Sequence, residues 1–106
     1  MRQVCQSENE MAITPLSADE IDAAMRDVPQ WRYDSDAQKL SRTWQFKNFA
    51  EAWAFLSHVA ALAEAHNHHP DIFNSYGQVT LMLTTHDCGG VSSRDIHFAR
   101  ALQKDE

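Results

Sequence analysis

Apolar residues recur at helical spacing in three parts of the chain. These parts cover about residues 17–28, 48–66 and 92–102. The first starts at Ser17, whose side chain can cap a helix while Glu20 reaches back to it, and Pro29 ends it. Asn48 and Ser92 are similar starting residues for the other two parts. The pattern therefore predicts three amphipathic helices.

Alternation of apolar and polar residues predicts strands between these helices. We expect the strands at about residues 31–33, 40–46, 72–76 and 79–86. Turn-forming residues at 34–37 join the first two strands into a hairpin. Gly77 supplies a bend or bulge between the last two strands, and Gly89 with Gly90 ends the final one.

The predicted element order is α-β-β-α-β-β-α. Strands joined by hairpins, with helices between them, favour an α+β fold. We expect a two-layer sandwich in which helices cover one face of a four-stranded antiparallel sheet. Residues 1–14 are polar and without periodicity, so we expect a flexible tail there and a single domain over residues 15–106. The free edges of such a sheet favour self-association into a homodimer or homotetramer.

The long middle helix carries a broad apolar stripe. Its members recur at helical spacing: Phe49, Ala52, Trp53, Leu56, Val59, Ala60 and Ala63. We expect this stripe to contribute to the core. Phe55 is expected to lie outside the stripe and to widen the apolar surface of the helix.

The composition is that of one small globular domain. The chain has 106 residues, of which 43% are hydrophobic, and this suffices for one modest core. A net charge of -6 and a pI near 5.4, with no basic stripe, argue against a nucleic-acid partner. Neither a signal peptide nor a membrane-spanning run is recognisable, so we expect a cytoplasmic protein with no membrane partner. Cys5 and Cys88 are expected to be reduced, unreactive thiols.

Three histidines stand where catalytic residues are often found. His68 and His69 follow the end of the long helix and precede Pro70, and His86 ends the clearest strand. An imidazole titrates at about pH 6.5, so it can give or take a proton near neutral pH. We therefore predict acid–base chemistry by these three side chains. The other histidines are expected at the surface or within a helix end: His58, His66 and His97.

Other chemistries fit the chain less well. Zinc sites usually combine four ligands and often paired cysteines, and the chain has neither an HExxH helix nor a CxxC motif, so we expect no metal and no cofactor. Cys88 is close to His86, but the glycines that follow favour a turn residue over a catalytic thiol. Asp95, the third residue of the last helix, could either complement the helix N-terminus or orient the site, and Glu64 is similarly open.

Four segments, in order and at consistent spacing, form a signature. They are Phe46-Lys47-Asn48-Phe49, His68-His69-Pro70-x-x-Phe73-Asn74-x-Tyr76, Val79-x-Leu81-x-Leu83-x-Thr85-His86 and Ser92-x-x-Asp95. From Trp31 to about Leu102 the chain resembles the pterin-4a-carbinolamine dehydratase family. The resemblance implies dehydration of 4a-hydroxytetrahydropterin to quinonoid dihydropterin and water, in tetrahydrobiopterin recycling beside an aromatic amino acid hydroxylase. It also implies dimers or tetramers.

The resemblance also implies roles for individual residues. The residues that match its active-site histidines are His68, His69 and His86, which we expect to be catalytic. Those expected to bind the pterin substrate are His69, Trp31, Asp95 and Tyr76. Asp95 matches the signature acid of the family, and Trp31 matches a tryptophan that lies near the pterin.

Three positions depart from the family pattern. Ile72 stands where a Trp is frequent, Gly77 where an Asn is usual, and Asn67 where an acid is often found. These changes concern pocket walls and polarity, so they leave the expected reaction type unchanged. Two other functions stay open, a non-catalytic interaction module of the dimerisation-cofactor kind and a pterin or metal binder without activity. The intact histidines favour the enzyme.

Overall fold

The computed structural model describes residues 15–85 and 89–105. Its helices are α1 (Ala18–Met25), α2 (Phe49–His66) and α3 (Ser93–Lys104). Its strands are β1 (Arg32–Asp34), β2 (Lys39–Gln45), β3 (Asp71–Ser75) and β4 (Gln78–Leu83). The predicted element order is confirmed, and the observed boundaries differ from the expected ones by a few residues. The expected tail, residues 1–14, lies outside the described residues, as do Cys5, His86 and Cys88.

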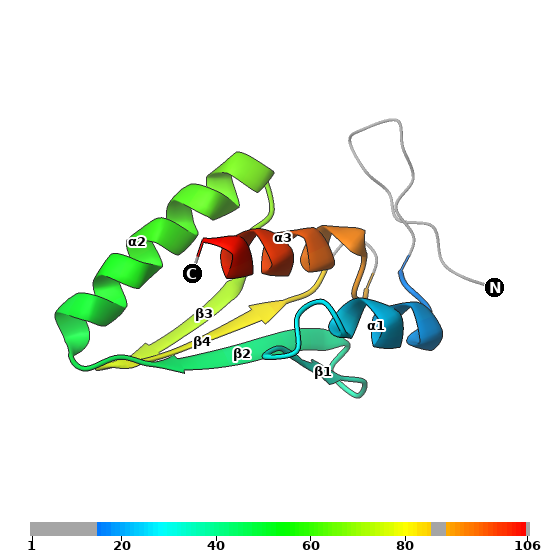
Figure 1. Cartoon of the computed structure of the whole chain (residues 1–106), viewed down its shortest axis with the longest axis horizontal. Coiled ribbons are helices and arrows are strands. Elements are labelled where there is room, and N and C mark those ends of the chain that lie inside the picture. The colour runs from blue at the N-terminus through cyan, green and yellow to red at the C-terminus, as the bar shows by residue number, and fades with distance from the viewer. Residues whose placement is uncertain (1–14, 86–88, 106) are drawn as a thin grey trace.

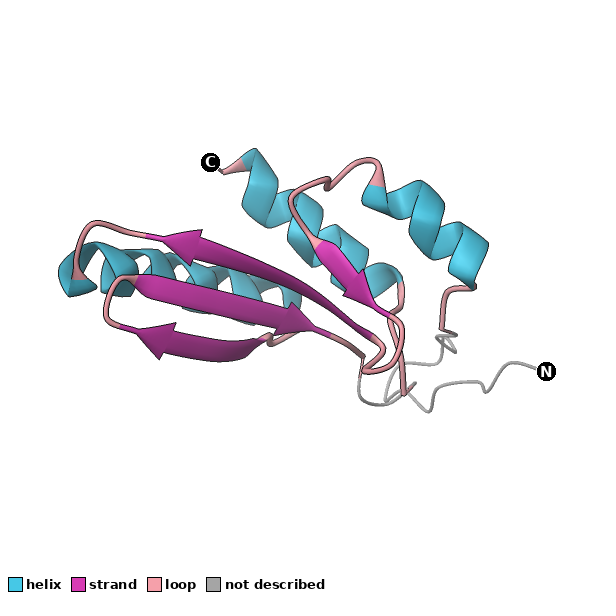
Figure 2. Ribbon diagram, turned by 90° about the horizontal axis from the view of Figure 1, so that it is seen from below, coloured by secondary structure: helices cyan, strands magenta, loops and turns pink. Residues whose placement is uncertain are grey.

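The four strands form one antiparallel sheet in the order β1-β2-β4-β3. All three helices lie on the same face of this sheet, and no described element covers the other face (Figures 1 and 2). The predicted two-layer α+β sandwich is therefore confirmed. In the parts of the chain that the structure describes, no helix is long and apolar enough to cross a membrane.

The core lies between the sheet and the helices. Alternate residues of β4 point into it, and Val79, Leu81 and Leu83 are completely buried. On β2, Leu40 lies opposite Leu83 in the register and is also completely buried. Phe98 of α3 packs over this surface with no exposed area. Burial of side chains of this size contributes about 1.5–3 kcal/mol each.

The orientation of α2 differs from the expected one. Phe49 and Trp53 are about half exposed, at 48% and 57%. Phe55 is instead half-buried, with its ring centroid 4.8 Å from that of Trp44 and 5.1 Å from that of Phe46. The expected stripe was therefore wrong at Phe49, Trp53 and Ala60, which is also exposed. The aromatic side chains of β2 and of the residue after it pack against Phe55, and this turns Phe55 toward the sheet.

The helix starts follow the sequence pattern. Ser17 and Ser92 both form complete capping boxes, with Glu20 and Asp95 as the reciprocal partners. At the start of α2, Asn48 accepts a hydrogen bond from the backbone N–H of Glu51. These caps satisfy backbone N–H groups that have no partner inside the helix.

Candidate functional site

The end of α2 determines where His68 lies. Asn67 adopts the left-handed conformation, with φ 49° and ψ 43°, and its N–H donates to the carbonyls of Ala63 and Glu64. The N–H of His68 then donates to the carbonyl of Ala63 at 3.1 Å. This double closure is a Schellman motif, which turns the chain sharply at the helix end. His68 is thus tied to the last turn of α2 by its own backbone.

The side chain of His68 meets Asp95, at the start of α3. His68 Nε2 lies 2.6 Å from Asp95 Oδ1, and the two side chains are 10% and 0% exposed. An ionised carboxylate only accepts hydrogen bonds, so the ring of His68 donates from Nε2. The other ring nitrogen, Nδ1, takes no part in this contact. The phenyl ring of Phe98 packs edge-on against the imidazole, with the centroids 6.5 Å apart.

Asp95 also completes the N-terminal cap of α3. Its Oδ2 atom accepts from the backbone N–H of Ser92 at 2.9 Å and from the hydroxyl of Thr85 at 2.9 Å. The sequence left open whether Asp95 complements the helix or orients the site. In the structure one oxygen of this carboxylate faces the helix cap and the other faces His68, so the two alternatives are compatible.

His69 has a different environment from that of its neighbour. Its Nε2 lies 2.6 Å from Glu64 Oε2, but the side chains are 57% and 78% exposed. Such an exposed side-chain contact contributes little to stability. The ring of His69 is therefore available to a ligand, whereas that of His68 is fixed by buried partners.

Trp31 and Tyr76 do not join this group of contacts. Trp31 is 3% exposed in the core, and its ring stands edge-on to Trp44 at 5.8 Å; its indole N–H has no hydrogen-bond partner among the described residues. Tyr76 is 68% exposed and follows β3, at the opposite end of that strand from His68. Their expected roles, and that of His86 outside the described residues, stay predictions.

Two residues of the group were not predicted as site residues. Thr85 and Ser92 are 3% and 0% exposed, and their hydroxyl oxygens are 2.5 Å apart. The sequence pattern could have pointed to Thr85, because Thr85 continues the alternation that places Val79, Leu81 and Leu83 on the buried face. A polar side chain on a buried face needs a hydrogen-bond partner, and Asp95 is that partner.

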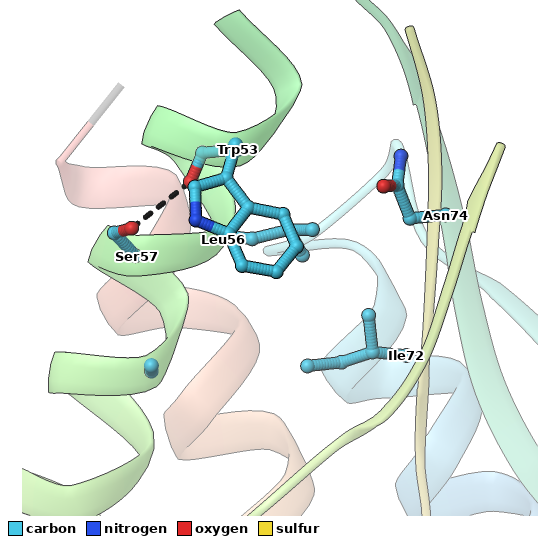
Figure 3. A pocket seen from close by; sticks show the side chains of 6 residues that line it. Trp53, Leu56, Ser57, Ile72 and Asn74 are labelled. Atoms are coloured by element: carbon cyan, nitrogen blue, oxygen red, sulfur yellow. Dashed lines mark hydrogen bonds between the residues drawn. The ribbon is translucent and has the colours of Figure 1, made fainter. Parts of the chain in front are cut away.

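A separate apolar groove lies between α2 and β3. It has a volume of about 340 Å³, and its lining residues are Trp53, Leu56, Ser57, Ala60, Ile72 and Asn74. Figure 3 shows the indole of Trp53 reaching from α2 toward Ile72 and Asn74 on β3. None of the histidines that the structure describes lines this groove, so it is distinct from the His68–Asp95 pair.

The described residues form no cluster of metal ligands. Within residues 15–85 and 89–105, no group of three or more His, Cys, Asp or Glu side chains is arranged to hold a metal ion.

The fold and the buried pair define a small α+β protein with a candidate acid–base site where the end of α2 meets the start of α3. A family model described as "Pterin 4 alpha carbinolamine dehydratase" matches residues 14–104. The chain belongs to the pterin-4-alpha-carbinolamine dehydratase family.

Individual relatives agree with this assignment. The chain is 42% identical over 93 residues to a Rhizorhabdus wittichii protein named "Putative pterin-4-alpha-carbinolamine dehydratase", covering 88% of this chain and 96% of that one. It is 45% identical over 92 residues to a Prochlorococcus marinus protein of the same name, with 87% and 94% covered.

Two solved structures share the fold. One is a transcriptional coactivator/pterin dehydratase from Brucella melitensis, with a TM-score of 0.80, 33% identity, and 85% of this chain and 96% of that chain covered. The other is a pterin dehydratase-like protein identified as a RuBisCO assembly factor in the alpha-carboxysome. Its TM-score is 0.60 at 26% identity, with 71% and 87% covered.

Proposed function

We propose that the protein is a 4a-hydroxytetrahydropterin dehydratase that works by histidine acid–base catalysis. The observation that supports this most is the His68–Asp95 pair, because a buried carboxylate orients an imidazole whose other ring nitrogen remains for proton exchange. Membership of the dehydratase family supplies the substrate class. The reaction would return the pterin to use after an aromatic amino acid hydroxylase has formed the carbinolamine, in tetrahydrobiopterin recycling in the cytoplasm.

The reaction requires two proton transfers and no change of oxidation state. The lone pair of N5 forms the double bond to C4a as the C4a–O bond breaks. One imidazolium delivers a proton to the departing hydroxyl, which leaves as water. A neutral imidazole removes the proton from N5, and the products are water and the quinonoid dihydropterin. Acid–base assistance of this kind contributes about 10²–10⁴-fold in rate.

The proposed roles combine the surroundings of His68 and His69 with the position of His86 in the sequence. His68 and His86 share the two proton transfers, His68 through Nδ1, and His69 contacts the pterin from its exposed position beside Glu64. His86 follows Thr85 directly in the chain, and Thr85 is hydrogen-bonded to Asp95. Asp95 acts on the substrate through His68.

The direct test is turnover of authentic substrate. 4a-Hydroxytetrahydropterin would be generated in situ by a hydroxylase, and the formation of quinonoid dihydropterin measured with and without the purified protein. We expect clear acceleration over the spontaneous reaction, and equal acceleration by His97→Ala, which changes an exposed histidine of α3. A rate equal to the spontaneous one at micromolar protein would contradict the assignment.

A protein-interaction function has its own supporting observation. Five large apolar side chains are about half exposed or more: Phe49, Trp53, Ile72, Phe73 and Tyr76. Of these five, Trp53 and Ile72 line the groove between α2 and β3, and exposed apolar surface of this kind commonly marks an interaction site. We propose that the groove between α2 and β3 is an interface between copies of this chain, in a dimer or a dimer of dimers.

A further inference from the structure

Thr85 occupies an unusual position just after β4. It lies on the buried face that Val79, Leu81 and Leu83 establish, and it is 3% exposed. Its backbone N–H donates to the carbonyl of Gly90 at 2.9 Å, and its carbonyl accepts from the N–H of Gly89 at 3.0 Å. The backbone of Thr85 is therefore held against the two glycines that precede α3.

The hydroxyl of Thr85 has two partners, and their chemistry sets the direction of each hydrogen bond. A hydroxyl has one proton to donate, and an ionised carboxylate only accepts. Thr85 therefore gives its proton to Asp95 Oδ2, at 2.9 Å. The proton between Thr85 and Ser92, 2.5 Å apart, must then come from the Ser92 hydroxyl. The Ser92 oxygen in turn accepts from the backbone N–H of Arg94.

These bonds leave Asp95 one orientation. Oδ2 is occupied by two donors, the hydroxyl of Thr85 and the N–H of Ser92, and Oδ1 faces His68 Nε2. The N–H of Ser92 belongs to the helix cap and is present whatever the side chain at position 85. The other donor on Oδ2 is the hydroxyl of Thr85, which lies just after β4. This hydrogen bond therefore links the carboxylate to the end of that strand.

We propose that Thr85 is a positioning residue that acts through Asp95. Its hydroxyl keeps Oδ1 of Asp95 directed at His68, and this keeps the imidazole proton on Nε2 and leaves Nδ1 for the substrate. This inference rests on the dehydration activity proposed above, so loss of the Thr85 hydroxyl should also change the kinetics of dehydration. Without the hydroxyl, the N–H of Ser92 alone holds Oδ2, so the carboxylate is held less firmly and His68 can adopt both neutral tautomers.

The kinetic test compares two substitutions of nearly equal size. Thr85→Val removes the hydroxyl and keeps the shape, and we expect it to lower kcat about tenfold while KM changes less than about twofold. Thr85→Ser restores the hydroxyl and should recover kcat to within about threefold of wild type. Thr43→Val is the matched control, because the Thr43 hydroxyl bonds Thr80 on the open face of the sheet. A folded Thr85→Val protein with wild-type kcat would overturn the role.

A second measurement needs no substrate. NMR spectra of protein labelled at the histidine ring nitrogens report which nitrogen of His68 carries the proton. We expect one tautomer, protonated at Nε2, in wild type and Thr85→Ser, and a mixture in Thr85→Val. An unchanged single tautomer in Thr85→Val would overturn the inference even if turnover fell. These spectra decide the role of Thr85 separately from whether the protein dehydrates the carbinolamine. If Thr85→Val does not fold, Thr85→Ala takes its place in both measurements, because it adds no methyl group beside the carboxylate.

Discussion

His68 and Asp95 are 27 residues apart in the chain, yet His68 Nε2 and Asp95 Oδ1 are 2.6 Å apart in the folded protein. The contact joins His68, two residues beyond the end of α2, to Asp95 in the first turn of α3. Because 10% of one side chain and none of the other is exposed, water competes little for this hydrogen bond. The pair therefore gives the imidazole a fixed orientation before any ligand binds.

Substitution of Asp95 by Asn should impair both catalysis and folding. If the amide N–H faces His68, the ring must accept through Nε2 and carry its proton on Nδ1; if the amide N–H faces Ser92 and Thr85, these buried donors lose their acceptor. We expect kcat to fall at least about tenfold and stability by about 1–3 kcal/mol. Turnover and urea unfolding would measure the two effects.

The chain offers a matched control for this substitution. Asp105 also faces a histidine, at 3.2 Å from His58, but the side chains are 48% and 45% exposed. Asp105→Asn should change stability by less than about 1 kcal/mol and leave turnover unchanged. If the two variants behaved alike, burial would not be what distinguishes the His68–Asp95 pair.

Gly77 should tolerate no side chain. A Cβ atom at position 77 would lie 2.4 Å from the carbonyl oxygen of Phe46. The two residues are also joined by a hydrogen bond, because the N–H of Phe46 donates to the carbonyl of Gly77 at 2.7 Å. We expect Gly77→Ala to destabilise the protein by about 2–3 kcal/mol, because backbone must move on both sides of the contact. At Gly90 the nearest atom would be 3.6 Å away, so Gly90→Ala should cost less than about 1 kcal/mol. Equal thermal unfolding of the two variants would contradict this difference.

Removal of divalent metal should leave activity unchanged. The proposed mechanism uses imidazole groups alone, so exhaustive treatment with a chelator and assay in metal-free buffer should give the untreated rate. Stoichiometric zinc in protein purified without added metal, together with loss of activity when the zinc is removed, would point to a metal site instead.

The protein should self-associate through the groove between α2 and β3. Light scattering at low micromolar concentration should give at least twice the mass of the 12.1 kDa chain. Trp53→Glu, which puts a charge in the groove, should lower the mass toward that of one chain.

Phe73→Glu is the control for this surface. Phe73 is 52% exposed and lies opposite Thr80 in the register, on the open face of the sheet. We expect this variant to remain associated. A wild-type monomer, or dissociation by Phe73→Glu but not by Trp53→Glu, would rule out the groove as the interface.

Much of the fold was predictable because its signals are local. The capping boxes at Ser17 and Ser92 and the alternation along β4 depend on residues a few positions apart. The rotation of α2 was not predictable, because Phe49, Trp53 and Phe55 are all apolar. Which of them is buried depends on Trp44, which belongs to another element.

The sequence allowed the residues of the candidate site to be predicted, but not the hydrogen bonds between them. His68 and Asp95 were recognised, but their hydrogen bond depends on how α2 and α3 approach each other. Thr85 could have been recognised from its polar side chain at a buried position of the strand pattern. Its partner was not predictable, because alternation predicts which face a residue occupies and not which polar group lies there.

The decisive test of His68 and His86 as proton carriers is a double substitution in the dehydration assay. His68→Ala and His86→Ala each remove one proposed proton carrier, so each should reduce turnover in part, and the double variant should approach the spontaneous rate. Circular dichroism and thermal unfolding would establish that the variants are folded, and His97→Ala should retain wild-type turnover. Near wild-type turnover by the folded double variant would contradict the account.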